Sequence, residues 1–198
     1  MSKLTDQLSQ NLINHRDYPL VKSVEANTWY TGRDLEEDVA ALRDQFAEQK
    51  IGAGDQVLIA LPNSPVFLPL NQALWEIGAV AHPIAAKTPL PELLTEWETY
   101  HYQAVITLPT VGKALEAPLV PWEKLQLHTI PELAILTDAS QLAYRINAPQ
   151  ARPQEDDLAL ILNTSGTTGK PKRVGLTHRM LLNAALHDAK SHAPVSYT

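Results

Sequence analysis

The sequence predicts an α/β fold in which helices flank a mostly parallel sheet. Short runs of apolar residues, typical of buried strands, alternate along the chain with longer segments whose apolar residues recur at helical spacing. The connections between these segments are short, which favours right-handed crossovers between neighbouring parallel strands. With 198 residues, of which 44% are hydrophobic, the chain is long enough to bury a core against such a sheet.

The first helix is expected after Thr31. Thr31 is a suitable N-cap residue and Asp34 follows three positions later, which resembles a capping box. Apolar residues then recur at spacings of four, three and four, so that they share one face of a helix. These residues are Leu35, Val39, Leu42 and Phe46. The apolar run 56–61 (QVLIAL) that comes next predicts a buried strand.

A second helix is expected directly after that strand. Ser64 can cap it, and Pro65 suits the first helical position because the N–H that proline lacks would be unpaired there. We expect this helix to reach about Ile77. Gly78 then predicts its end, since glycine adopts the left-handed conformation that commonly terminates helices.

The later segments continue the alternation of strands and helices. The run 79–84 predicts a strand that Pro83 would end or place at an edge. A helix is expected over 89–100, and Thr177 is a candidate N-cap for another that starts near His178. Further strands are predicted at 103–107, 133–137, 157–163 and 173–176.

Two proline-rich stretches, 109–121 and 148–157, are expected to be loops. The second is a candidate boundary within a chain that otherwise forms one domain over 1–198. This organisation places the last predicted strands and helix after an exposed crossing.

Composition excludes several classes of function. The net charge of −6 and a pI near 5.6 argue against a dedicated nucleic-acid binder, which usually carries a basic face. The absence of cysteine excludes disulfides, cysteine–zinc sites and thiol catalysis. No apolar run is long enough for a transmembrane helix, and the polar first residues do not predict a signal peptide. We therefore expect a cytoplasmic protein.

The segment from Thr164 to Lys172 carries the strongest chemical signal. Its nine residues, TSGTTGKPK, contain four hydroxyl side chains, two glycines and two lysines. Glycines let successive backbone N–H groups converge on an anion, hydroxyls add donors and lysines add positive charge. No acidic residue lies between Thr164 and Met180, whereas four basic residues do. The segment predicts a polyphosphate-binding loop, although its composition alone also fits an ordinary Ser/Thr/Gly-rich loop.

The loop does not fit the P-loop pattern G-x-x-x-x-G-K-[ST]. Counting back from Gly169-Lys170, the first glycine of that pattern falls on Thr164. The position after Lys170, where a P-loop has Ser or Thr, is Pro171. The residues that follow also predict a strand, where a P-loop continues as a helix.

TSGTTGKPK resembles the phosphate-loop signature of the adenylate-forming superfamily, which includes acyl-CoA synthetases, luciferases and the adenylation domains of peptide synthetases. The resemblance extends to three further stretches: 29–42, 51–83 with its G-D-x-V-x-I-x-L-P-N-S pattern, and 156–182. It implies the N-terminal part of the adenylate-forming fold. Region 109–153 matches only loosely.

The resemblance also implies roles for individual residues. In the family this loop surrounds the β- and γ-phosphates of ATP while a carboxylate attacks the α-phosphorus. The implied phosphate-binding residues are Thr164, Ser165, Gly166, Thr167, Thr168, Gly169 and Lys172. Lys172 would also act catalytically, by opposing the charge that builds on the departing pyrophosphate. ATP, Mg2+ and CoA are the implied cofactors, and a small carboxylic acid is the implied substrate. No metal-ligating protein residue is implied.

Other candidate residues are interpreted as structural. His178 starts a helix, His82 and His101 are isolated in sequence, and Trp75 and Trp97 have the spacing of core residues. The family often has glycine where this chain has Arg173, and we expect this arginine to point into solvent.

The expected function is ATP-dependent activation of a carboxylic acid, through an acyl-adenylate to an acyl-CoA. Thr167 and the sequence Ala81-His82-Pro83 favour an acyl-CoA synthetase over a fragment of an amino-acid adenylation domain, which the sequence also allows. Because family members are several times longer, we expect an incomplete N-terminal AMP-binding domain that lacks the C-terminal catalytic domain and is inactive alone. Two different functions also fit the sequence: a non-catalytic remnant that binds a partner or forms a homo-oligomer, and an unrelated phosphate binder.

Overall fold

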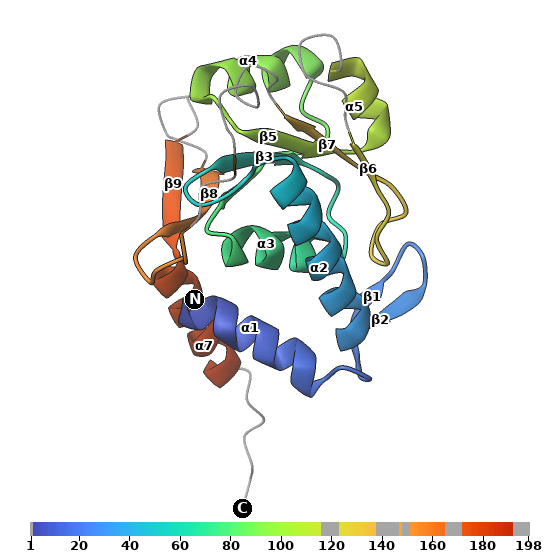
Figure 1. The fold of residues 1–198 in the computed structure, drawn as a ribbon, viewed down its shortest axis with the longest axis vertical. Helices are drawn as coiled ribbons and strands as arrows, with labels where there is room; N and C mark the ends of the chain where they lie inside the picture. Colours follow the sequence, from blue (N-terminus) through green and yellow to red (C-terminus); the bar gives the residue numbers. More distant parts are fainter. Residues whose placement is uncertain (1, 116–122, 138–146, 148–150, 165–171, 192–198) are drawn as a thin grey trace, which may run out of the picture.

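The computed structural model describes residues 2–115, 123–137, 147, 151–164 and 172–191. A seven-stranded sheet lies at its centre, with α4 and α5 over one face and α2 and α3 over the other (Figure 1). Its helices are α1 (Lys3–Asn14), α2 (Gly32–Glu48), α3 (Phe67–Glu76), α4 (Leu90–Tyr100), α5 (Pro109–Leu115) and α7 (His178–Ser191). Its strands are β1 (Pro19–Ser23), β2 (Thr28–Thr31), β3 (Gln56–Ala60), β4 (Val80–Pro83), β5 (Ala104–Thr107), β6 (Glu123–Leu125), β7 (Leu133–Thr137), β8 (Leu158–Thr164) and β9 (Lys172–Thr177).

The order of strands in the large sheet is β6-β7-β5-β3-β4-β8-β9. The four inner strands from β5 to β8 run parallel, which confirms the predicted α/β class with its mostly parallel sheet. The outer strands are antiparallel: β7 to β5, β6 to β7 and β9 to β8. A small antiparallel pair, β1–β2, lies apart from this sheet.

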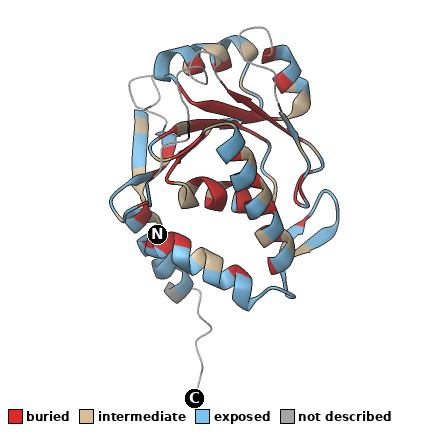
Figure 2. Cartoon of the chain, in the orientation of Figure 1, coloured by how far each residue is buried: buried red, intermediate tan, exposed pale blue. Residues whose placement is uncertain are grey.

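The inner strands β3 and β5 send alternate side chains into two separate cores. On β3, Val57 and Ile59 join the core under α2 and α3, whereas Leu58 and Ala60 join the core under α4. This follows from the two-residue period of a strand, and it explains why β3 is apolar at almost every position. Figure 2 shows the result as a continuous buried layer in the middle strands.

The predicted start of α2 is confirmed. The Thr31 hydroxyl accepts from the backbone N–H of Asp34, and the Asp34 carboxylate accepts from the backbone N–H of Thr31. The predicted apolar face of this helix is buried.

The predicted cap of α3 is wrong. This helix begins at Phe67, its N-cap position is Val66, and no side chain caps it. Ser64 instead uses its backbone carbonyl, which accepts from the Phe67 N–H at 3.2 Å in a turn through Pro65. Gly78 ends the segment as predicted, with φ at +76°.

Three regular regions were not predicted. They are α1 with β1 and β2, the strand β6, and α5, which occupies the first part of the expected loop 109–121. Of the second predicted loop, residues 151–157 lack regular secondary structure and 148–150 lie outside the described residues. Whether this stretch separates two domains remains a prediction.

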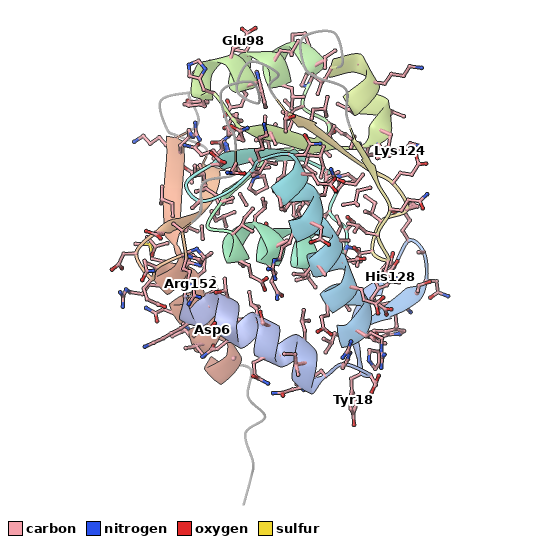
Figure 3. All side chains as sticks on the ribbon, in the orientation of Figure 1. Asp6, Tyr18, Glu98, Lys124, His128 and Arg152 are labelled. Carbon is pink, nitrogen blue, oxygen red and sulfur yellow. The ribbon has the colours of Figure 1, made fainter. Side chains whose placement is uncertain are left out.

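Charged side chains cover the outside of the fold. Figure 3 shows Glu98 on α4 and Lys124 on β6 projecting away from the ribbon, and both residues are exposed. Among the helices that the structure describes, none is long and apolar enough to cross a membrane.

Candidate functional site: the β8–β9 hairpin

The two ends of the candidate phosphate loop lie opposite each other on neighbouring strands. Thr164 is the last residue of β8, Lys172 is the first residue of β9, and the two are register partners. The Thr164 hydroxyl donates to the backbone carbonyl of Lys172 at 3.2 Å. The structure therefore brings together the first and last of the predicted site residues.

The loop between these two residues lies outside the described part of the chain. It contains the other predicted phosphate-binding residues, which are Ser165, Gly166, Thr167, Thr168 and Gly169. Their proposed roles therefore stay predictions.

The hairpin presents its loop end at the carboxyl edge of the parallel sheet. β8 runs parallel to β4, with Ala81 opposite Leu160, so both strands end at the same edge. In open α/β sheets, ligands bind at this edge. The Lys172 side chain is exposed there, and no described carboxylate forms an ion pair with it. Its charge is thus available to an anion.

A polar network that was not predicted lies beside the hairpin. The imidazole of His82, at the end of β4, is fully buried. Its Nε2 lies 3.3 Å from Oδ1 of Asn163, and its Nδ1 contacts the Tyr102 hydroxyl. That hydroxyl donates to Oε1 of Glu96 at 2.9 Å. His82 is isolated in sequence, and the residues that surround its ring are distant from it in the chain.

Burial and charge act on the His82 imidazole in the same direction. Desolvation lowers its pKa, and the nearby positive charge of Arg173 lowers it further, while Glu96 and the bond with Asn163 oppose the shift. His82 is thus held neutral at neutral pH. Burial and the bond to Glu96 likewise raise the pKa of Tyr102, so its hydroxyl stays protonated.

Arg173 does not point into solvent, which corrects the prediction. Its guanidinium Cζ lies 3.7 Å from the centre of the Tyr100 ring, and its Nη2 donates to Oε1 of Gln56 at 2.9 Å. The aromatic ring at the end of α4 stabilises the cation and covers its flat face. No sequence pattern links these three residues, since Tyr100 and Gln56 are distant from Arg173 in the chain.

Neighbouring residues on β9 face opposite sides of the sheet. Because side chains alternate along a strand, Lys172 and Arg173 cannot point the same way. Arg173 reaches the side that carries α4, where it contacts Tyr100. Of the four basic residues near the loop, Arg179 is also engaged elsewhere, in an ion pair with Asp156 at 2.8 Å. Two of the four basic residues, Arg173 and Arg179, therefore already interact with other side chains of the protein.

The structural roles predicted for His178, Trp75 and Trp97 agree with the structure. His178 is fully buried at the start of α7, and its Nδ1 lies 3.0 Å from the Ser2 hydroxyl. Trp97 is a buried residue of α4, and the indole N–H of Trp75 donates to the Ala159 carbonyl at 2.8 Å. The Thr177 hydroxyl accepts from the Met180 N–H at 3.3 Å, as expected of the cap of α7.

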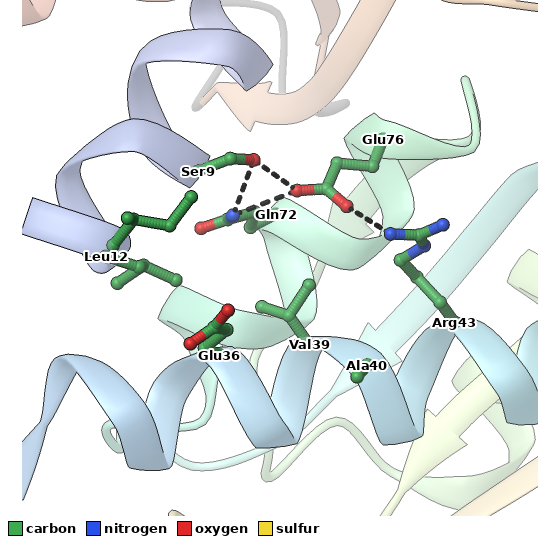
Figure 4. Close-up of a pocket in the computed structure, with 9 residues that line it drawn as sticks. Ser9, Leu12, Glu36, Val39, Ala40, Arg43, Gln72 and Glu76 are labelled. Atoms are coloured by element: carbon green, nitrogen blue, oxygen red, sulfur yellow. Dashed lines mark hydrogen bonds and ion pairs between the residues drawn. The ribbon is translucent and has the colours of Figure 1, made fainter. Parts of the chain in front are cut away.

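A separate cavity of about 250 Å3 lies between α1, α2 and α3 (Figure 4). Among the described residues, four of its five polar lining side chains bind one another, and the fifth, Glu36, pairs with Arg16. Ser9 and Gln72 both donate to Oε1 of Glu76, at 2.8 and 2.9 Å, and Arg43 donates to Oε2 at 3.1 Å. Both carboxylate oxygens of Glu76 are therefore already paired within the protein.

The comparison of the chain with known protein families shows its membership of one of them. The family described as AMP-binding enzyme matches residues 8–196, nearly the whole chain. The chain belongs to this family. Its mostly parallel sheet and flanking helices are those of the N-terminal part of an adenylate-forming enzyme.

Relatives in the AMP-binding family include two kinds of enzyme. A sulfoacetate–CoA ligase of Cupriavidus necator is 29% identical over 184 residues, which cover 89% of this chain and 35% of the ligase. Component F of enterobactin synthase from Escherichia coli is also 29% identical, over 173 residues that cover 87% of this chain and 12% of that protein. The chain thus spans about a third or less of these relatives.

Among solved structures, the N-terminal domain of FACL13 from Mycobacterium tuberculosis superimposes with a TM-score of 0.72. It is 27% identical, and the match covers all of this chain and 49% of that one. The likeness therefore extends from the AMP-binding sequence pattern to the arrangement of the helices and strands.

Proposed function

We propose that the protein activates a carboxylic acid with ATP, and that this chain supplies the phosphate-binding loop. One observation carries the proposal. In a member of the AMP-binding family, Thr164 and Lys172 lie at the two ends of the loop signature, at the carboxyl edge of the sheet, and the exposed Lys172 forms no ion pair with a described carboxylate.

The reaction is a displacement at phosphorus. A carboxylate oxygen attacks the α-phosphorus of ATP, the bond from that phosphorus to the oxygen bridging to the β-phosphate breaks, and pyrophosphate leaves with the bonding electrons. The ammonium group of Lys172 opposes the negative charge that grows on the leaving group, which lowers the barrier electrostatically. Thr164 donates its proton to the Lys172 carbonyl in this structure, so it must rotate before it can donate to a phosphate.

The residues of the chain are compatible with magnesium bound through the nucleotide. Within the described residues, no group of three His, Asp or Glu side chains could hold a metal ion. Mg2+ is commonly held by substrate phosphates and water with few protein ligands, and when bound it would neutralise phosphate charge. Lys172 would then act beside the metal and not in place of it.

We further propose that CoA accepts the activated acyl group. Thr167 and the sequence Ala81-His82-Pro83 favour an acyl-CoA synthetase. Amino-acid adenylation is the competing assignment within the same chemistry, because the CoA ligase and the enterobactin synthase component are equally similar to this chain. A cytoplasmic location remains a prediction from the sequence.

The test is carboxylate-dependent exchange of labelled pyrophosphate into ATP, measured on the protein as isolated from its source. Aliphatic acids, aromatic acids and amino acids are supplied in turn, followed by CoA to detect a thioester. We expect exchange with at least one class of acid, and at least about tenfold slower exchange for Lys172→Ala with an unchanged melting temperature. An equal rate in the variant would contradict the role of Lys172, and no exchange with any acid would contradict the proposed reaction.

A second candidate is a protein-interaction role, which exposed apolar side chains on the hairpin favour. Leu158, Leu162 and Val174 are 43%, 37% and 41% exposed. Such a surface favours association with a partner or a second copy. Sedimentation velocity tests this role: self-association that Leu162→Asp weakens would support a homo-oligomer, whereas a monomer at all concentrations would exclude it.

A further inference from the structure

The residues next to the two ends of the loop both form side-chain contacts on the side of the sheet that carries α4. Asn163 precedes Thr164 on β8 and Arg173 follows Lys172 on β9, and they are register partners. Each uses its side chain for a contact on the α4 side of the sheet. Thr164 and Lys172, the residues of the proposed phosphate site, alternate with this pair along their strands.

On β8, the strand that precedes the loop, Asn163 contacts a network of buried side chains. Its Oδ1 contacts the imidazole of His82, which is itself held by the Tyr102 hydroxyl. Tyr102 is fully buried and donates to Glu96 on α4. Burial of the ring and its contacts with Tyr102 and Asn163 together fix the orientation of the His82 imidazole.

On the returning strand, Arg173 reaches the same helix. Its guanidinium lies on the Tyr100 ring, 3.7 Å from the centre, and also 5.7 Å from the centre of the Tyr102 ring. A hydrogen bond to Gln56 fixes its in-plane direction. Glu96 and Tyr100 both belong to α4. The residues next to the two ends of the loop are therefore connected to the same helix, Arg173 directly and Asn163 through His82 and Tyr102.

These side-chain contacts supplement sparse backbone pairing. The ladder between β4 and β8 records a single register pair, Ala81 with Leu160. The far strand β9 pairs only with β8 among the described strands. The hairpin therefore has few main-chain bonds that could fix where its loop end lies relative to the rest of the sheet.

We propose that His82 and Arg173 are positioning residues for the phosphate loop. His82 acts through Asn163 and Arg173 acts through Tyr100, and together they fix where the hairpin end that carries Thr164 and Lys172 lies relative to the rest of the sheet. The identity of that ligand rests on the proposed function. Arg173 does not bind the phosphates, because it faces the side of the sheet opposite to Lys172.

The first experiment is a titration of the chain with MgATP, using variants on the returning strand. Arg173→Gln is expected to weaken binding about tenfold, the effect of losing ~1.4 kcal/mol. Arg173→Lys should recover most of the affinity, since an ammonium group can still lie over the ring. Tyr100→Ala should weaken binding as much as Arg173→Gln, and the double variant no further. Arg33→Gln, at an exposed arginine paired with Asp17, is the matched control and should bind as the wild type does.

Two results would overturn this assignment. If Arg173→Gln weakens binding and Tyr100→Ala does not, Arg173 contacts the phosphates directly. If neither variant changes the affinity, the contact with α4 does not position the loop.

The second experiment separates this proposal from the proposed function. Hydrogen exchange of backbone amides is followed without nucleotide in the wild type, Arg173→Gln and Asn163→Ala. We expect faster exchange at the loop end of the hairpin (163–164 and 172–173) and unchanged exchange at its other end, near Leu158 and Leu176. Exchange that is faster along the whole hairpin, or exchange rates equal to those of the wild type, would overturn the positioning role. If the wild type binds no MgATP while exchange in the variants is faster only at the loop end, the proposed function fails. The positioning of the hairpin end by these side chains then stands.

Discussion

The centre of the sheet and the β8–β9 hairpin are held in place by different forces. In β3, the four residues from Val57 to Ala60 are at most 5% exposed, and their side chains enter two apolar cores. In β9, no residue is buried, and β8 has only Ala159 and Ile161 buried (Figure 2). The centre depends on apolar burial, whereas the hairpin depends on a few polar and aromatic contacts.

This difference places the candidate site on the less strongly held part of the fold. A buried aliphatic side chain contributes roughly 2–5 kcal/mol when measured by its removal, and a single hydrogen bond contributes about 1 kcal/mol. The contacts of Asn163 and Arg173 belong to the second kind. Substitutions near the site are therefore expected to change ligand binding before they unfold the protein.

The largest effect is expected from a cavity in the centre. Leu58 is fully buried in the core under α4, so Leu58→Ala should lower the free energy of unfolding by about 3 kcal/mol. The matched change on the hairpin, Leu162→Ala, should cost less than about 1 kcal/mol because that side chain is 37% exposed. Urea denaturation of both variants measures the contrast, and equal losses would refute it.

A smaller effect is expected where the hairpin joins the helices. The indole of Trp75 donates to the Ala159 carbonyl of β8. Trp75→Phe keeps an aromatic ring but removes the donor, which should cost about 1–2 kcal/mol. Thermal denaturation measures the loss, and Trp29→Phe, at a 55% exposed position, is the control that should show almost none.

Mild acid should destabilise the fold through two buried histidines. Burial lowers the pKa of His82 and of His178 below the ordinary 6.5, so the unfolded chain binds protons more readily than the folded one. Their contribution to stability is therefore complete above about pH 6.5 and is lost as the pH falls below it. Urea denaturation between pH 7.5 and 5.5 should show this loss, and His178→Gln should make it smaller. A free energy of unfolding that rises as the pH falls from 7.5 to 5.5 would contradict the lowered pKa values of the two histidines.

The centre of the sheet could be predicted from the sequence better than the contacts of the β8–β9 hairpin could. The central strands and α2 were predicted because burial and capping leave local patterns, such as QVLIAL and the pair Thr31–Asp34. The TSGTTGKPK motif likewise predicted the family, whereas the phosphate-binding roles of its residues stay predictions. These features need only neighbouring residues.

The contacts around the hairpin could not be predicted in this way. His82, Tyr102 and Asn163 meet only because the sheet orders β4, β5 and β8 as it does, and Arg173 meets Tyr100 for the same reason. The antiparallel direction of β7 was missed because an apolar run does not encode the direction of its partner. The turn at Ser64 was missed because its backbone carbonyl replaced the side-chain cap.

The central claim is that the loop end of the β8–β9 hairpin binds the phosphates of ATP through Lys172. The most direct measurement is a calorimetric titration of the chain with MgATP, comparing the wild type with Lys172→Ala. Lys124→Ala serves as the control, since Lys124 is similarly exposed and pairs with Glu132 away from the hairpin. We predict that Lys172→Ala weakens binding at least about tenfold, the loss expected for one charge-assisted contact, while Lys124→Ala binds as the wild type does. Equal affinity of the wild type and Lys172→Ala, or no binding by the wild type, would contradict the claim.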